Sequence, residues 1–184
     1  DRSPKGSVDR RIVNILQELN QRENYVTTSS CSGRVLFVSN SEDGKGTRGK
    51  STCTGRWRIS HDGIDSPSDY FCLQTEPLKD HLNELWLQVQ SMELQVACAD
   101  LRSAVALMSA TKTVFNRAFI KSASREWKTL VHIEGNQSIE MPFALAGEQV
   151  YSGSTEALAD IVNAKLRKNW ADMDRLLDAY RTLL

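Results

Sequence analysis

Five small residues in a row, Ser29-Ser-Cys-Ser-Gly33, stand directly before Arg34. The stretch Tyr25–Thr28 reads as a strand, so the small residues are expected to form a turn at its end. Such a turn directs several backbone N–H groups and hydroxyls to one point, which is how backbone concavities hold anions. The Arg34 guanidinium can pair with the same anion through two parallel hydrogen bonds. An anion site is therefore expected at Ser29, Ser30, Ser32, Gly33 and Arg34, against the alternative of a serine-rich turn with a surface arginine.

A second pattern, Gly44-Lys-Gly-Thr-Arg-Gly-Lys-Ser51, matches the phosphate-loop sequence GxxxxGK[ST] in full. That loop works only between a strand and a helix whose N-terminus faces the phosphates. Here the following residues, Arg56-Trp-Arg-Ile-Ser-His61, alternate basic or polar with apolar side chains and predict a strand. We expect a basic hairpin tip that touches an RNA backbone, and a small nucleoside triphosphatase is the alternative.

Length and charge limit the classes of protein to which the chain can belong. With 184 residues, 40% of them hydrophobic, the chain is expected to form a single domain over residues 1–184. Lys plus Arg and Asp plus Glu number 23 each, so no overall field draws the protein to nucleic acid or to a membrane. A local basic patch is still enough to bind RNA. No apolar run approaches the roughly 20 residues of a membrane span, and the opening residues predict no signal peptide.

Cysteines and histidines show no metal-ligand spacing. The four cysteines contain no CxxC pair and the three histidines are scattered, so we expect no bound metal. A core of this size folds without disulfides, which favours reduced thiols in an intracellular, cytoplasmic protein. These residues are Cys31, Cys53, Cys72, Cys98, His61, His81 and His132.

Helices and strands alternate along the chain without a repeat, which predicts an α+β fold. Apolar residues at helical spacing predict a helix that begins at Ser7 with Asp9 in its first turn, and a second helix after Pro77 that runs to Val89. Asp100 and Ser154 are expected to cap two further helices, the second of them long. The expected strands are Tyr25–Thr28, Arg34–Val38, Arg56–His61, Met92–Cys98, Thr129–Ile133 and Ile139–Phe143.

Two blocks near the start of the chain carry a family resemblance. Lys5-Gly-Ser-Val-Asp9 and Thr27-Thr-Ser-Ser-Cys-Ser-Gly-Arg34, with a predicted helix between them, resemble the wybutosine-synthesis tRNA methyltransferase family. Further along, Trp57 and His61 match that family's W…H pair, and Leu94-Gln95-Val96 resembles its LHV strand. The last helix, with Asn163, Lys165 and Asn169, resembles the terminal helix of the family.

The resemblance implies both a reaction and a fold. It implies an S-adenosylmethionine-dependent methyltransferase that N-methylates the tricyclic guanosine-derived base beside the anticodon of tRNA(Phe). The implied fold is a compact α+β domain, with a mixed or antiparallel sheet or a pseudo-barrel packed with helices, and not the doubly wound methyltransferase sheet. Oligomeric state is left open between a monomer and a weak dimer.

Two stretches depart from the family pattern. The family's EPxxLHV strand becomes Gln90-Ser91-Met92-Glu93-Leu94-Gln95-Val96, which replaces a carboxylate, a proline and a histidine. Its FRNSG turn becomes Phe115-Asn-Arg-Ala-Phe119, with arginine and asparagine in swapped order. These changes motivate an alternative, a catalytically silent RNA-binding relative that has kept the fold.

With the resemblance, individual residues acquire expected roles. The ring nitrogen must lose a proton during methyl transfer, and Asp9 and His61 are the expected acceptors. Their alternatives are a carboxylate that complements a helix dipole and a histidine that ends a strand. The anion at Ser29–Arg34 becomes the carboxylate of the donor or a tRNA phosphate. Phosphate contacts are expected from Lys5, Lys45, Arg48, Lys50, Arg56 and Arg58.

Overall fold

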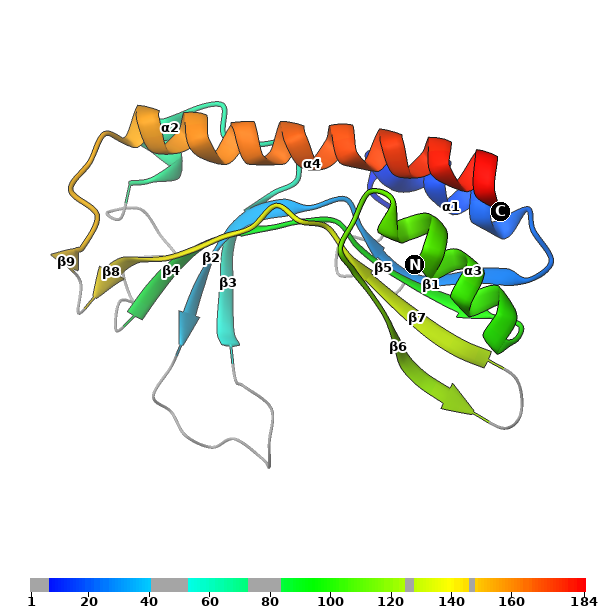
Figure 1. Ribbon diagram of the computed structural model, residues 1–184. Helices are drawn as coiled ribbons and strands as arrows, with labels where there is room; N and C mark the ends of the chain where they lie inside the picture. Colours follow the sequence, from blue (N-terminus) through cyan, green and yellow to red (C-terminus); the bar gives the residue numbers. More distant parts are fainter. Residues whose placement is uncertain (1–6, 41–52, 73–83, 125–127, 146–147) are drawn as a thin grey trace. The chain divides into compact units, whose positions relative to one another are not determined.

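The computed structural model describes residues 7–40, 53–72, 84–124, 128–145 and 148–184 (Figure 1). The chain forms two compact units, each assembled from separate segments. Unit 1 comprises Asp1–Gly33, Ser91–Gln137 and Arg167–Leu184, and unit 2 comprises Arg34–Gln90 and Ser138–Leu166. This division does not test the expectation of a single domain over residues 1–184, which stays a prediction.

Unit 1 contains a four-stranded antiparallel sheet. In spatial order its strands are β1 (Tyr25–Cys31), β5 (Glu93–Cys98), β7 (Lys128–Glu134) and β6 (Arg117–Ser124). Side chains alternate between the two faces of such a sheet. Leu94, Val96, Val131 and Ile133 lie on one face and are fully buried, so this face forms the floor of the core.

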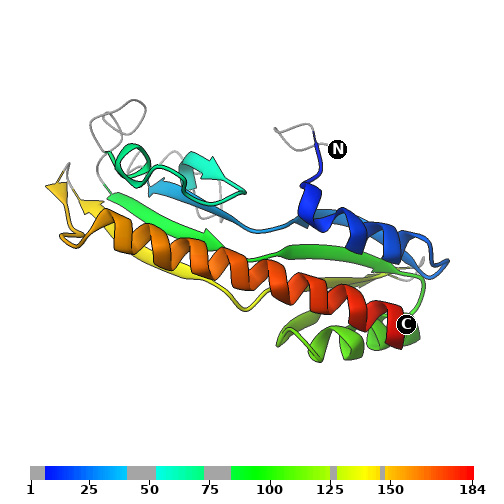
Figure 2. The ribbon, with the colours of Figure 1, turned by 90° about the horizontal axis from the view of Figure 1, so that it is seen from above.

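Helices cover that face of the sheet. They are the 3-10 helix η1 (Arg10–Ile12), α1 (Val13–Asn20), α3 (Leu101–Lys112) and the part of α4 (Thr155–Leu183) from Arg167 onward. Seen from above, the end of α4 lies between α1 and α3 (Figure 2). The Tyr180 hydroxyl lies 2.8 Å from Thr111 Oγ1 of α3, and the Arg11 guanidinium lies 3.7 Å from the Trp170 ring centroid. The core of unit 1 is otherwise largely aliphatic.

Unit 2 contains a five-stranded antiparallel sheet. Its strands are, in spatial order, β3 (Cys53–Ser60), β2 (Arg34–Asn40), β4 (Glu84–Gln90), β8 (Ile139–Leu145) and β9 (Glu148–Gln149). The short helix α2 (Pro67–Tyr70) brings two aromatic rings onto this sheet. Phe37 lies 5.0 Å from Phe143 and 5.6 Å from Tyr70 between ring centroids, and Phe71 stacks on Phe143 at 5.4 Å. A cluster of aromatic rings thus packs on the sheet of unit 2.

Much of the sequence-based fold is confirmed. The protein is α+β, and every strand pair that the structure describes is antiparallel, so the doubly wound parallel sheet is absent from the described residues. β2 and β3 form the expected hairpin. Asp100 accepts a hydrogen bond from Ser103 N at 2.7 Å, and Ser154 Oγ accepts one from Ala157 N at 3.2 Å, as expected of helix caps.

Strands β4 and β6 differ from the prediction. The helix expected to run to Val89 is wrong over its second half, because Glu84–Gln90 is strand β4, with Leu85, Leu87 and Val89 buried in alternation. The first half of that prediction, from Pro77, lies outside the described residues. Strand β6 was not predicted, because its eight residues carry no clear apolar alternation.

Among the described residues, no helix combines the length and the apolar composition needed to cross a bilayer.

The Cys98 thiol is buried and forms no disulfide, and burial raises its pKa to about 11.

Candidate functional site

One residue from each of the two sequence blocks that carry the resemblance, Asp9 and Ser32, meet in unit 1. Asp9 Oδ2 accepts a hydrogen bond from Ser32 N at 3.0 Å and another from Ser32 Oγ at 3.2 Å. Both side chains are buried, with Asp9 at 9% and Ser32 at 1% exposure. Asp9 is the N-cap residue of η1, and not a first-turn residue as predicted, and its side chain makes no cap hydrogen bond. Its carboxylate therefore holds a distant segment of the chain.

Asn169 of α4 holds the same turn from the other side. Asn169 Nδ2 donates to Ser32 O at 2.8 Å, and its Oδ1 accepts from Met92 N at 2.8 Å. Gly33, the next residue, has φ +96°, a left-handed conformation that glycine adopts without strain. Asp9, Asn169 and the glycine conformation together determine where the chain leaves the turn.

The expected five-residue turn is wrong, because β1 extends through Cys31. Ser29, Ser30 and Cys31 pair with Gln95, Leu94 and Glu93 of β5. Only Ser32 and Gly33 lie between β1 and β2. The serine-rich composition suggested a turn, whereas pairing with β5 makes these residues part of a strand.

Arg34 begins a row of hydrogen bonds across unit 2. Its Nε donates to Gln90 Oε1 at 2.7 Å, and Gln90 Nε2 donates to Gln88 Oε1 at 3.0 Å. Gln88 Nε2 in turn donates to Glu140 Oε1 at 3.0 Å. The two terminal nitrogens of Arg34 make no hydrogen bond within the described part of the chain. They are the groups with which an arginine binds a carboxylate or phosphate in a bidentate manner.

His61, the second expected proton acceptor, belongs to unit 2 and follows β3 directly. The loop after it is held in place by Asn163, whose amide bonds both the N–H and the C=O of Ile64, at 2.8 and 2.9 Å. Gly63 within this loop has φ +106°. His61 is therefore attached to an ordered segment, and its catalytic role stays a prediction.

The expected RNA-contacting arginines lie on β3. Arg56 is paired with Val38 of β2. The Arg58 guanidinium donates to the backbone oxygens of Asp69, Tyr70 and Cys72 at the end of α2. It thus satisfies carbonyls that the helix end leaves without partners. A role of Arg56 or Arg58 in RNA binding remains a prediction.

The remaining expected cations lie outside the described residues, as does the phosphate-loop-like stretch 44–51. They are Lys5, Lys45, Arg48 and Lys50. The described chain resumes with strand β3 at Cys53, which agrees with the predicted strand after this stretch and not with the helix of a phosphate-binding loop.

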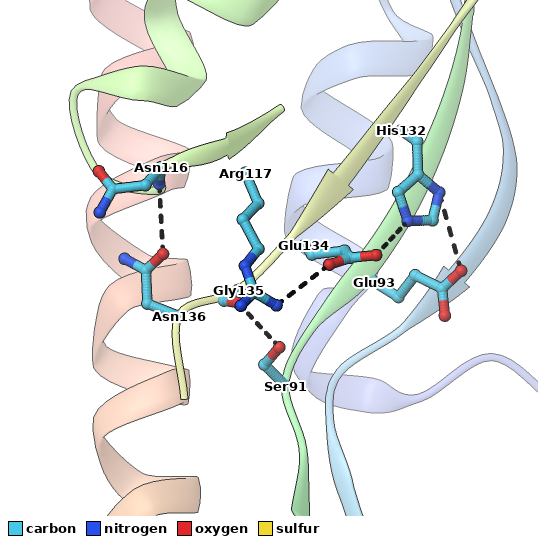
Figure 3. Close-up of polar contacts among 8 residues, drawn as sticks. All are labelled: Ser91, Glu93, Asn116, Arg117, His132, Glu134, Gly135 and Asn136. Atoms are coloured by element: carbon cyan, nitrogen blue, oxygen red, sulfur yellow. Dashed lines mark hydrogen bonds and ion pairs between the residues drawn. The ribbon is translucent and has the colours of Figure 1, made fainter. Parts of the chain in front are cut away.

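Sequence reasoning missed a polar cluster on unit 1 (Figure 3). His132 Nε2 lies 2.9 Å from Glu134 Oε1, and Glu134 Oε2 lies 3.4 Å from Arg117 Nη1. His132 Nδ1 lies 3.8 Å from Glu93 Oε1, and the Phe119 ring lies 5.1 Å from the imidazole between centroids. Alternation along β7 could have placed His132 and Glu134 on one face, but strand pairing was needed to add the others.

Backbone contacts frame this cluster. Ser91 Oγ donates to Gly135 O at 3.0 Å, and Gly135 N donates to Met92 O at 2.8 Å. Asn136 Oδ1 accepts from Asn116 N at 3.2 Å (Figure 3). Ser91 and Asn116, which depart from the family pattern, thus lie just before β5 and β6 and contact the residues that follow β7, Ser91 through its side chain and Asn116 through its backbone N–H.

Comparisons with known proteins agree with these features. The family model described as Methyltransferase TYW3 matches residues 1–182. A tRNA(Phe) 7-((3-amino-3-carboxypropyl)-4-demethylwyosine(37)-N(4))-methyltransferase from Thermococcus sibiricus is 28% identical, and the alignment covers 100% of this chain and 89% of that protein. A tRNA wybutosine-synthesizing protein 3 homolog from Mus musculus is 31% identical over 92% of this chain and 63% of its own length.

Solved structures give the same result for the fold. The PH1069 protein from Pyrococcus horikoshii superposes with a TM-score of 0.78 at 27% identity, over 98% of this chain and 87% of that one. A hypothetical protein from Aeropyrum pernix has a TM-score of 0.77 at 20% identity, over 96% and 99% of the two chains, and shares the fold. The chain spans less than two thirds of the mouse relative. Because the family model matches nearly every residue, this chain belongs to the methyltransferase TYW3 family.

Proposed function

We propose that this protein N-methylates a wyosine-type nucleoside of tRNA(Phe), with S-adenosylmethionine as the methyl donor. The contact between Asp9 and Ser32 carries the proposal, because it joins the two blocks that this chain shares with the family into one buried arrangement. The substrate is supported by the name of the Thermococcus sibiricus relative, to which all of this chain aligns.

The donor's methionine moiety requires a partner for its carboxylate. Ser29, Ser30 and Arg34 are proposed to bind it, and the terminal nitrogens of Arg34 provide the bidentate group. Ser32 and Gly33 are proposed to place Ser29, Ser30 and Arg34 and not to bind the carboxylate themselves. The N–H and hydroxyl of Ser32 are already bonded to Asp9, and Gly33 sets the direction of the chain into Arg34. S-adenosylmethionine supplies an electrophilic methyl group when bound, and the protein orients the acceptor in line with it.

Asp9 and His61 are proposed to take up the proton that the ring nitrogen loses. The Asp9 carboxylate is held by two hydrogen bonds from Ser32, and a carboxylate held in place is one of the groups that can accept a proton. An imidazole is effective in the same role near neutral pH. Contacts to tRNA phosphates are proposed for Lys5, Lys45, Arg48, Lys50, Arg56 and Arg58.

Radiolabelled methyl transfer tests this function. The substrate is tRNA(Phe) from a strain that lacks the enzyme, so the unmethylated nucleoside accumulates, and donor binding is followed by calorimetry. Arg34→Ala should weaken donor binding by about 1.5 to 3 kcal/mol, the worth of a charge-assisted hydrogen bond. Arg102→Ala, on the exposed face of α3, is the matched control.

His61→Ala and Asp9→Asn should leave binding nearly intact but slow single-turnover methylation by about 100-fold or more. Full activity of both variants would remove the two residues from the chemistry. A protein that binds tRNA but neither binds nor uses the donor would instead be the catalytically silent relative. ATP hydrolysis abolished by Lys50→Ala would revive the triphosphatase.

A further inference from the structure

The face of the unit 1 sheet opposite the helices carries two rows of side chains across neighbouring strands. Directly paired residues of antiparallel strands project to the same side. One row consists of Cys31, Glu93, Glu134 and Arg117, and the other of Ser29, Gln95, His132 and Phe119. Through these two rows, the side chains of β1, which contains most of the serine-rich block, adjoin the polar cluster of Figure 3.

His132 has an unmet hydrogen-bonding group within this cluster. The Glu134 carboxylate can only accept, so the 2.9 Å contact assigns the proton to Nε2 of the imidazole. Nδ1 of the neutral ring is then an acceptor. It is buried without a hydrogen-bond partner, and the whole side chain is 8% exposed. Its neighbour, Glu93 Oε1, is a second acceptor 3.8 Å away.

The two acceptors, His132 Nδ1 and Glu93 Oε1, are 3.8 Å apart, a distance at which one donor group can bind both. A single nitrogen about 2.8 Å from each of them would donate to both, and an ammonium group carries enough N–H bonds to do so. The Glu93 side chain is 50% exposed, so it can turn outward to admit such a group. A primary ammonium is therefore the group that would satisfy Nδ1 and pair with Glu93.

The opposite charge stands at the other end of the same row. The Arg117 side chain is 64% exposed, and its only ion pair among the described residues is the 3.4 Å contact with Glu134. Its remaining N–H groups can hold a carboxylate. Phe119, 46% exposed, presents an aromatic ring 5.1 Å from the His132 imidazole between centroids. The face thus offers a carboxylate, an orphaned imidazole nitrogen, a guanidinium and a stacking surface.

We propose that this face binds the 3-amino-3-carboxypropyl side chain of the substrate nucleoside. In this arrangement Glu93 and His132 Nδ1 hold the ammonium, Arg117 holds the carboxylate, and Phe119 stacks on the tricyclic base. The inference rests on the proposed function, since that group occurs in the substrate named for the Thermococcus sibiricus relative. Two carboxylates and one guanidinium in this row favour a zwitterion over a tRNA phosphate, which has no positive group to pair with Glu93.

The methyl donor carries the same amino-acid group, so the experiment must separate the two sources. Arg117→Gln and Glu93→Gln are compared with Arg102→Gln and Glu23→Gln, which make the same chemical changes at exposed positions of unit 1. Each protein is assayed with tRNA(Phe) carrying 7-(3-amino-3-carboxypropyl)-4-demethylwyosine and with tRNA(Phe) carrying 4-demethylwyosine alone. Donor affinity is measured by calorimetry without tRNA.

The two site variants should lose about tenfold or more in kcat/KM with the tRNA that carries the group. They should show the wild-type value with the tRNA that lacks it, and unchanged donor affinity. An equal loss on both tRNAs, or a weakened donor affinity, would overturn the inference. Failure of the wild-type protein to methylate either tRNA would refute the proposed function instead, whereas activity indifferent to both site variants would refute only this inference.

Discussion

Two asparagines of α4, one in each unit, perform the same task under different conditions. Asn163 bonds the N–H and C=O of a single residue, Ile64, and its side chain is half-buried. Asn169 bonds Ser32 O and Met92 N, which belong to two separate segments, and it is 1% exposed. The asparagine of unit 2 fastens one loop, whereas that of unit 1 joins segments at the candidate site.

A glycine accompanies each asparagine. A Cβ at Gly63 would lie 2.6 Å from Asn163 Oδ1, and one at Gly135 would lie 2.9 Å from Asn169 Oδ1 and 2.8 Å from Ser91 Cβ. In both units, then, an asparagine side chain bonds backbone groups outside the sheets. A glycine lies next to that side chain, where a Cβ would come too close to the amide oxygen. Burial is the main difference between the two, and it should set the size of each mutational effect.

Asn169→Ala should have the largest effect. It leaves a buried N–H and a buried C=O without partners, at roughly 1 to 3 kcal/mol each, so the free energy of unfolding should fall by about 3 to 5 kcal/mol. Urea denaturation followed by circular dichroism measures this loss. A change below about 1 kcal/mol would mean that water reaches both groups, and the contrast between the units would disappear.

The two glycines should rank next. Gly135→Ala forces a Cβ against the Cβ of Ser91, which cannot rotate away, and should cost about 2 to 3 kcal/mol. Gly63→Ala adds the strain of a non-glycine residue at positive φ, although Asn163 Oδ1 can shift, and should cost about 2 kcal/mol. Thermal melts of both variants give the order. The double variant Gly135→Ala/Ser91→Gly should recover much of the first loss.

Asn163→Ala should cost less, about 1 to 2 kcal/mol, because water can reach the Ile64 groups in a half-exposed position. The same urea titration used for Asn169→Ala measures it. A cost equal to that of Asn169→Ala would contradict the importance of burial. His61, in the same loop, should show a broadened NMR signal in this variant if Asn163 fixes the segment.

A rise to alkaline pH should lower the free energy of unfolding by less than any of these substitutions. Burial raises the pKa of Cys98 from 9.0 to about 11, and the pKa values of Tyr25 and Tyr180 are raised by burial as well. The unfolded chain then loses these protons first, so stability is complete below pH 9 and falls as the pH rises towards 11. The Cys98 share should be about 1 kcal/mol at pH 10. Cys98→Ala should flatten this slope in unfolding experiments at pH 8, 9 and 10.

Local signals were sufficient for several elements of the fold. Asp100 and Ser154 cap helices because a single side chain and the next turn contain all the atoms involved. The stretch with Leu85 and Val89 was predicted as a helix because its apolar residues continue a helical spacing that begins at Leu78. With Leu87, the same residues also alternate as in a strand. Only the neighbouring strands β2 and β8 decide in favour of β4.

The candidate site depended on information that a single sequence does not contain. The serine-rich block pointed to a polar site, but the contact from Asp9 to Ser32 spans 23 residues and that from Ser32 to Asn169 spans 137. His132 was dismissed as scattered because Glu93 and Arg117 become its neighbours only through the register of β5, β7 and β6. Pairing of strands, which sequence patterns do not encode, created that cluster.

The division of the chain into interleaved segments also has a consequence for biosynthesis. Unit 1 joins segments that lie far apart in the sequence, since Tyr180, fully buried in its core, belongs to Arg167–Leu184, whereas β1 belongs to the segment that ends at Gly33. Domains made of one continuous stretch can fold in order as they are synthesised. In unit 1, both segments of unit 2 are synthesised between β1 and Arg167–Leu184, so the core cannot close around Tyr180 until those segments have been made. A truncation that removes Arg167–Leu184 therefore deprives the core of unit 1 of Tyr180 and the candidate site of Asn169.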